Sequence, residues 1–137
     1  MRLLPDTNIV NYVLKAIPGV RERLEESITG GDEIMLCPPV HFEMVRYLLL
    51  KGASRVLRGY EALTARWTWS DLSRSDWEEA ARIWSQCHRK GLAVSDFDVL
   101  IGTMAMRRDA VVVTHDTRHF ESLGVPTVDW VPRGQES

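Results

Sequence analysis

The sequence predicts an α/β fold in which a mostly parallel central sheet is covered by helices on both faces. Short apolar runs alternate with stretches of helical periodicity along the chain, and glycine or proline separates many of them. Strands separated by helices are joined by crossovers, which produce parallel strands with helices on either side. The length of 137 residues, 45% of them hydrophobic, suits one such domain with its own core.

The N-terminal half opens with an apolar strand that runs straight into an acid, Asp6. Breaks at Pro18-Gly19 and Gly30-Gly31 delimit the two helices that follow. Pro38-Pro39 opens a further helix, because proline is tolerated in a first turn. The elements expected here, in chain order, are a strand at Arg2–Pro5, helices at Asn8–Lys15 and Val20–Ile28, a strand at Ile34–Cys37, and helices at Pro38–Leu50 and Ser54–Arg66.

In the C-terminal half, Trp67–Ser70 alternates apolar and polar residues, which is the periodicity of a strand. Ser75–Glu78 matches a capping box and opens a helix that ends at Gly91. This helix is expected to present one face made of Trp77, Ala81, Trp84 and His88. The remaining expected elements are a helix at Phe97–Arg107, a strand at Val111–Val113, a helix at His119–Leu123 and a strand at Thr127–Trp130.

The chain is expected to form one domain over residues 1–132, followed by a flexible tail at residues 133–137. No segment approaches the roughly 20 apolar residues of a membrane span, and Pro5 and Asp6 precede any possible signal-peptide core. A cytoplasmic protein without a membrane partner is therefore expected. Cys37 and Cys87 lack metal-type spacing, and buried reduced thiols are the expected state of both.

The charge balance does not decide the function. Seventeen basic and nineteen acidic residues give a net charge of −2, whereas a passive nucleic-acid binder is usually basic. An enzyme that recruits RNA through bound cations is compatible with this balance. A protein that never touches RNA is equally compatible.

Four acids fall where the predicted topology gathers side chains. Asp6 directly follows the first strand, and Asp116 follows the Val111 strand, so these two converge if the strands are neighbours. Glu43 lies in the helix after the second strand, and Asp98 lies in the first turn of the helix that leads to Val111. Small residues at 102 and 105 on the Asp98 face are expected to let that helix approach the sheet and bring Asp98 toward Asp6.

Each acid also has an ordinary structural interpretation. Asp6 could cap the helix that follows it, and Asp98 could complete a capping box that starts at Ser95. Asp116 could belong to a turn, and Glu43 could be a solvated helix residue. The functional interpretation depends on all four acids meeting at one edge of one sheet.

A cluster of carboxylates at one edge needs a compensating charge. Two like charges about 4 Å apart repel by about 1 kcal/mol in water and by about 4 kcal/mol at a protein-like dielectric. A bound cation or raised pKa values must offset this repulsion. Ligands that are all oxygen favour Mg²⁺ or Mn²⁺ over zinc, and such ions activate water for attack on a phosphodiester.

Motifs along most of the chain resemble the PIN-domain nucleases, and among them the VapC toxins of bacterial toxin–antitoxin pairs. The similarity runs in the family's order from about Met1 to Val131, with Gly102 at a position where alanine is commoner. The segments that carry it are Leu3–Asn8 with its Asp-Thr-Asn, Val40–Met44 with one glutamate, Asp98–Ala105, Val113–Phe120 with its Val-Thr-x-Asp, and the closing Val128–Trp130.

The resemblance implies a PIN-like three-layer α/β/α fold and a metal-dependent endoribonuclease, the toxin of a VapBC-type system. It implies that Mg²⁺, or Mn²⁺ in its place, activates a water that cleaves RNA. It further implies a homodimer and a VapB-type antitoxin that occludes the site. The residues it assigns as catalytic acids and metal ligands are Asp6, Glu43, Asp98 and Asp116, with Thr7, Asn8 and Thr114 as possible supporting residues.

Some alternatives stay open. Asp96 precedes Asp98 by two residues and is an alternative ligand, although helical spacing favours Asp98. His115 and His119 are four residues apart, but no zinc motif surrounds them, so a metal role is not assigned. An Mg²⁺-dependent phosphotransfer domain also gathers acids at a sheet edge, and a non-catalytic PIN-like binding module would use them to hold a partner's arginines.

Overall fold

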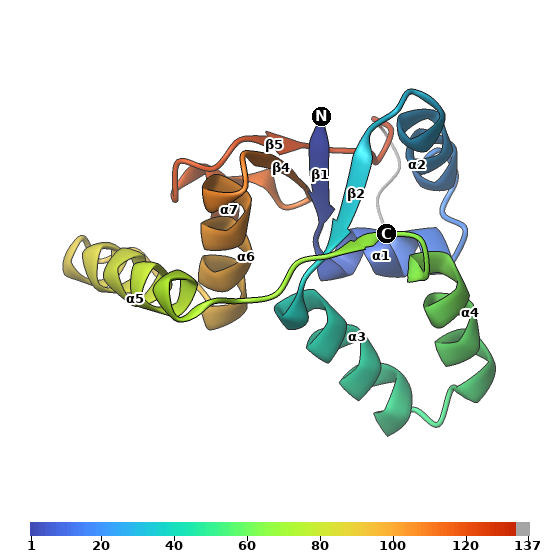
Figure 1. Cartoon of the computed structure of the whole chain (residues 1–137), viewed down its shortest axis with the longest axis horizontal. Helices are drawn as coiled ribbons and strands as arrows, with labels where there is room; N and C mark the ends of the chain where they lie inside the picture. Colours follow the sequence, from blue (N-terminus) through green and yellow to red (C-terminus); the bar gives the residue numbers. More distant parts are fainter. Residues whose placement is uncertain (134–137) are drawn as a thin grey trace.

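The protein is described here by a computed structural model, which describes residues 1–133. Its centre is a five-stranded sheet in the order β3-β2-β1-β4-β5, and every strand pair is parallel (Figure 1). The strands are β1 (Arg2–Pro5), β2 (Glu33–Leu36), β3 (Thr68–Trp69), β4 (Ala110–Val113) and β5 (Thr127–Val128). The predicted α/β fold with a parallel sheet is confirmed.

Seven helices connect the strands of the described chain. Most of them match the predicted ranges to within about two residues, and α3 has the predicted bounds. The helices are α1 (Thr7–Leu14), α2 (Val20–Thr29), α3 (Pro38–Leu50), α4 (Ser54–Thr64), α5 (Arg74–Arg89), α6 (Asp96–Arg107) and α7 (Thr117–Glu121). None of them is long and apolar enough to cross a membrane.

Apolar side chains fill both faces of the sheet, which makes the fold a three-layer sandwich. Along β1, Leu4 points into a core shared with α3, α4, α6 and α7, and Leu3 points into a second core shared with α1 and α2. This alternation follows from the two-residue period of a strand. Both predicted buried thiols are confirmed, since Cys37 and Cys87 are free and buried.

The centre of the sheet fixes where the first acid lies. The register pairs Pro5 of β1 with Val113 of β4, and the backbone N–H of Asp6 donates to the carbonyl of Val113 at 2.9 Å. Both strands therefore end at the same edge of the sheet. The predicted neighbourhood of the two strands is confirmed.

The start of α5 differs from the prediction. The capping box is formed by Ser73 and Asp76, not by Ser75 and Glu78, so α5 begins two residues earlier than the motif suggested. This start buries Asp76, whose carboxylate accepts hydrogen bonds from Arg107 at 2.7 Å and from Arg108 at 2.7 Å. The two guanidiniums hold the pKa of Asp76 below its usual range.

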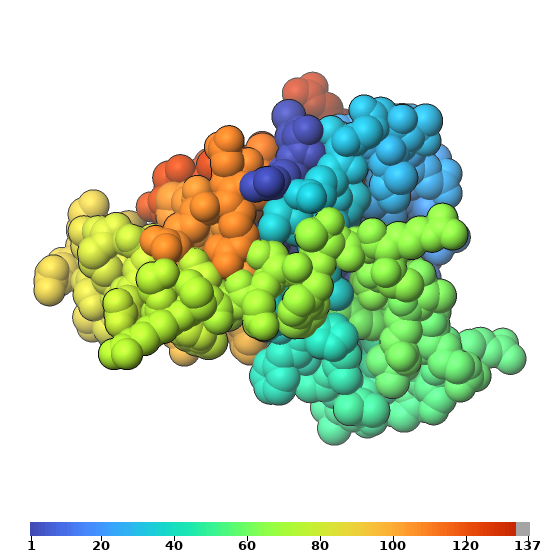
Figure 2. Space-filling model, in the orientation of Figure 1, coloured from blue at the N-terminus to red at the C-terminus, as the bar shows by residue number. Residues whose placement is uncertain are grey.

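The predicted tryptophan face of α5 is not the buried face. Trp77 and Trp84 are 52% and 42% exposed, whereas Ala80, Ile83 and Cys87 pack against α6. Figures 1 and 2 show α5 projecting from one side of the molecule. In the same orientation, the segment between α4 and α5 crosses the face of the molecule toward the viewer. Arg108 holds that segment through Ser70 and the carbonyl of Asp71.

The close approach at Gly102 is real, but its partner differs from the prediction. A Cβ added there would lie 3.1 Å from Leu123 and 3.2 Å from Val125, which precede β5, so this glycine accommodates that connection and not β1. Ala105 lies in the core that contains Leu4. Of the predicted tail, residues 134–137 lie outside the described residues.

Candidate active site

Asp6 is held at the end of β1 by its own backbone and by the helix that follows. Its carboxylate accepts from the N–H of Ile9 at 3.0 Å and so caps α1, and it also accepts a hydrogen bond from the Thr114 hydroxyl. The side chain is buried, and burial raises the pKa of Asp6 to about 6, with smaller contributions from the charges of Asp98 and Asp116. Asp6 therefore both caps α1 and is a buried acid with a raised pKa.

Thr114 connects the two acids that follow β1 and β4. Its side chain is fully buried, and its oxygen accepts from the backbone N–H of Asp116 at 2.9 Å while the hydroxyl donates to Asp6. Asp116 does not cap α7 with its side chain, so its carboxylate is not occupied by the helix end. The hydroxyl therefore fixes the spacing between two neighbouring strand ends.

Asp98 reaches the same place from α6. The Ser95 side chain accepts from the N–H of Asp98 at 3.1 Å, which starts the helix and leaves the Asp98 carboxylate unused by the cap. His119 lies between the two partly exposed acids, with Nδ1 3.3 Å from Asp98 and 3.0 Å from Asp116. Three acids from β1, β4 and α6 are thus near neighbours.

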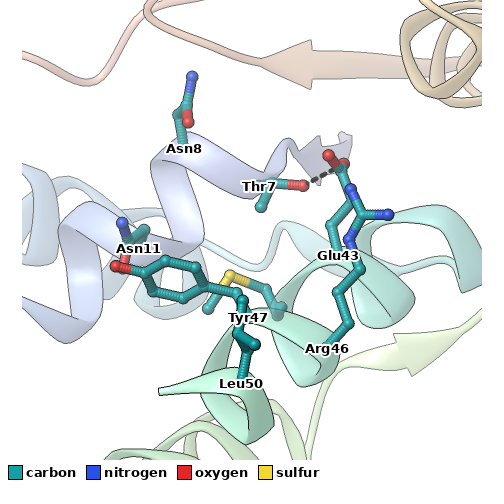
Figure 3. Close-up of a pocket in the computed structure, with 8 residues that line it drawn as sticks. Thr7, Asn8, Asn11, Glu43, Arg46, Tyr47 and Leu50 are labelled. Carbon is teal, nitrogen blue, oxygen red and sulfur yellow. Dashed lines mark hydrogen bonds between the residues drawn. The ribbon is translucent and has the colours of Figure 1, made fainter.

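Glu43 of α3 is joined to the residue that follows Asp6. The hydroxyl of Thr7, the residue after Asp6, donates to Oε1 of Glu43 at 2.7 Å (Figure 3). This bond links α1 to α3 beside a cavity of about 560 Å³ between the two helices. The residues that line the cavity are Thr7, Asn8, Asn11, Glu43, Met44, Arg46, Tyr47 and Leu50.

Asp96 and Asp98 lie in different surroundings. Asp96 is exposed and lines a surface pocket with Trp77, Trp84 and Leu100 between α5 and α6. Asp98 faces His119 and contributes to the field at Asp6. The helix rotation therefore points Asp98, and not Asp96, toward the other acids.

The donor set fits a hard divalent cation. The candidate ligands are carboxylate oxygens, and the raised pKa of Asp6 shows a buried acid that lacks a compensating positive charge. Within residues 1–133, however, no three His, Cys, Asp or Glu side chains already surround one point as metal ligands. His119 instead occupies the space between Asp98 and Asp116.

Two residues near the acids were not identified from the sequence. No zinc motif surrounds His119 in the sequence, yet one turn of α7 places it three residues after Asp116 and against Asp98. His115, its expected alternative partner, pairs with Asp129 at 2.9 Å instead. Arg46 lies one helical turn after Phe42 on α3, and that spacing was the available signal for it.

Comparison with family models matches the PIN domain to residues 3–125. Among curated proteins, the chain is 29% identical over 134 residues to the tRNA(fMet)-specific endonuclease VapC of Shigella flexneri, covering 95% of this chain and 98% of that protein. It is 30% identical over 125 residues to ribonuclease VapC19 of Mycobacterium tuberculosis strain H37Rv, covering 88% and 92%.

Solved structures with the same fold include VapBC2 from Rickettsia felis bound to a DNA fragment from their promoter. That similarity has a TM-score of 0.86 at 20% identity and covers 95% of this chain and 99% of the other. DNA-bound VapBC from Salmonella typhimurium gives a TM-score of 0.79 at 25% identity, with 95% and 98% covered.

Proposed function

Because this chain belongs to the PIN domain family, we propose that it is a metal-dependent endoribonuclease and the toxin of a VapBC-type toxin–antitoxin pair. The relatives named as a tRNA(fMet)-specific endonuclease and a ribonuclease support hydrolysis of RNA phosphodiesters. The similar VapBC complexes support a VapB-type antitoxin as the protein partner. Such a toxin acts in the cytoplasm, where its RNA is found.

One observation carries the proposal. Asp6, Asp98 and Asp116 meet at one edge of the sheet, where Thr114 contacts both Asp6 and Asp116 and His119 lies against both Asp98 and Asp116. Like charges are gathered in this way only where something offsets their repulsion. A functional requirement accounts for that cost better than the fold does, because Ser95 already starts α6 with its own side chain.

We assign the ion to Asp6, Glu43, Asp98 and Asp116, with Mg²⁺ as the resident metal and Mn²⁺ as a substitute. When bound, Mg²⁺ supplies an activated water and offsets charge on the phosphate oxygens. Thr114 and Thr7 act on the ligands and not on the substrate, because they orient Asp6 and Glu43. Asp96 is left out of the ligand set because it faces α5.

The role of each residue follows from how deeply its side chain is buried. Asp6 is buried and doubly hydrogen-bonded, so it fixes the position of the ion. Asp116 is half exposed, which leaves its carboxylate accessible to solvent and substrate. Nδ1 of His119 lies within ion-pairing distance of Asp98 and Asp116, so a protonated His119 holds the two acids in place.

Two other functions compete with this proposal. An Mg²⁺-dependent phosphotransfer domain would form a stable aspartyl phosphate, and a non-catalytic PIN-like module would bind a partner without divalent-dependent cleavage. A homodimer, which the family resemblance implies, is compatible with all three. The intact acid set favours the nuclease.

Cleavage of RNA by the purified protein tests the proposal. Activity is expected with Mg²⁺ or Mn²⁺, to be lost in excess EDTA, and to be absent in Asp6→Asn. Asp109→Asn is the matched control, because Asp109 is exposed and precedes β4 at the opposite end of that strand. Equal cleavage in EDTA would refute the metal assignment, and no cleavage of any RNA with Mg²⁺ would favour the binding module.

A further inference from the structure

Arg46 of α3 is held by two aromatic rings next to the acid cluster. Its Cζ lies 5.1 Å from the ring centroid of Phe42 and 5.0 Å from that of Phe97, and the two rings stack at 28° with centroids 6.1 Å apart. Phe42 precedes Glu43 in α3, and Phe97 precedes Asp98 in α6. The aromatic pair therefore bridges the two helices that carry these acids.

The guanidinium of Arg46 keeps its hydrogen-bonding capacity. It has no ion pair or hydrogen bond with any residue that the structure describes, and its side chain is exposed. An arginine stacked on rings loses less conformational freedom on binding than a free surface arginine. Arg46 is thus an oriented cation with unused donors that lines the same cavity as Glu43, and an oriented guanidinium of this kind suits a phosphate.

Arg46 also lines the cavity between α1 and α3. In Figure 3, Thr7 of α1 meets Glu43 of α3 through their hydrogen bond, and Asn11 of α1 lies at the ring end of Tyr47 of α3, while Asn8 points away from α3. The amide of Asn11 can pair with the edge of a nucleobase, and the ring of Tyr47 offers a stacking surface. The cavity of about 560 Å³ is large enough for one nucleotide.

We propose that this cavity binds the RNA nucleotide adjacent to the cleaved bond, with Arg46 holding its phosphate and Asn11 and Tyr47 contacting its base. The inference rests on the proposed ribonuclease function and names a substrate-binding site for it. Local charge favours a phosphate at this point, because the Arg46 guanidinium supplies the positive charge that a polyanion needs near acids that otherwise repel it. Phe42 and Phe97 act as positioning residues for Arg46.

Affinity for a short fluorescein-labelled single-stranded RNA tests this site. Fluorescence anisotropy is measured with Ca²⁺ in place of Mg²⁺, so that binding is followed without relying on cleavage. Arg46→Gln is expected to weaken binding about tenfold and to lower the slope of log affinity against log salt by about 0.7, the value for one phosphate contact on a single strand. Phe97→Leu is expected to weaken binding less, because the charge remains.

Arg23→Gln is the matched control, since Arg23 is also exposed and lies on α2. Its affinity and salt slope are expected to equal those of the wild type. Suppose that the wild type binds and cleaves RNA, but Arg46→Gln and Arg23→Gln have the same RNA affinity and salt slope. That result would overturn this inference alone and leave the cavity to a protein partner. A wild type that neither binds nor cleaves RNA would overturn the proposed function as well.

Discussion

The hydroxyl of Thr7 donates a 2.7 Å hydrogen bond to Oε1 of Glu43, and this bond joins the helix that Asp6 begins to a helix 36 residues further along the chain. A charged acceptor makes such a bond stronger than one between neutral groups. The bond therefore connects Glu43 to the end of α1 that Asp6 caps. Orientation of Glu43 is therefore open to a direct test.

Thr7→Val is expected to lower RNA cleavage about tenfold, because residues that orient metal ligands typically change affinity or activity by 10- to 100-fold, roughly. The Mg²⁺ concentration for half-maximal activity should rise, while thermal stability should change little. Thr68→Val is the control, since Thr68 makes an exposed 3.4 Å bond to Glu33 at the far edge of the sheet. An equal effect in both variants would show that Thr7 has no special role.

Asp6→Asn is expected to stabilise the metal-free protein at neutral pH. Burial raises the pKa of Asp6 from 3.8 to about 6. At pH values between these two, the folded state therefore holds a proton that the unfolded state has lost. The stability that Asp6 contributes is present below about pH 4 and is lost as pH rises through about 6, by at most about 3 kcal/mol. Urea unfolding in EDTA should show that the difference in free energy of unfolding between Asp6→Asn and the wild type widens from pH 4 to 6. A constant gap would contradict the assignment.

Mg²⁺ is expected to raise the melting temperature of the wild type and to do so more at pH 7.5 than at pH 5. Metal binding requires the ionised acid, and at pH 5 Asp6 is still protonated because its pKa is raised. Differential scanning fluorimetry at constant ionic strength measures this effect. Asp6→Asn should lose the response and Asp109→Asn should keep it, whereas a response that Asp6→Asn retains would place the ion elsewhere.

Asp76→Asn is expected to destabilise the protein by about 3 kcal/mol without changing the activity of the folded fraction. The substitution leaves Arg107 and Arg108 beside a buried neutral group, and breaking a buried ion pair has a cost of this size. Glu78→Gln is the control, because its pair with Arg74 is exposed and contributes little. Chemical denaturation measures both variants. A similar small loss of unfolding free energy in Asp76→Asn and Glu78→Gln would mean that Asp76 does not join α5 to α6.

The central sheet and its helices were predictable because their signals are local. Pro38-Pro39 marked the start of α3 and the acids at strand ends marked the site edge, so both follow from short segments of sequence. Ser73 and Ser75 each have an acid three residues later, and local pattern alone cannot rank them. Ser73 is the residue that caps α5, because this start buries Ile83 against α6 and pairs Asp76 with Arg108. Both of these are tertiary contacts.

Details of the site were predictable to a smaller extent. The acids could be placed at one edge of the sheet, because parallel strands end together. The place of His119 depends on where α7 begins, which the prediction put two residues too late. The stacking of Arg46 on Phe97 joins segments about fifty residues apart, and no local pattern indicates it.

Because β1 lies at the centre of the sheet and α7 lies at the periphery, the two sides of the site are expected to differ in amide exchange rate. β1 has hydrogen-bonded strands on both sides, so the amides near Asp6 are expected to exchange with solvent only on global unfolding. α7 has five residues and carries His119 at the periphery, where opening costs much less. A cation shared by Asp6 and Asp116 would join the slowest-exchanging strand to a fast-opening turn, and amide protection would then spread outward into α7.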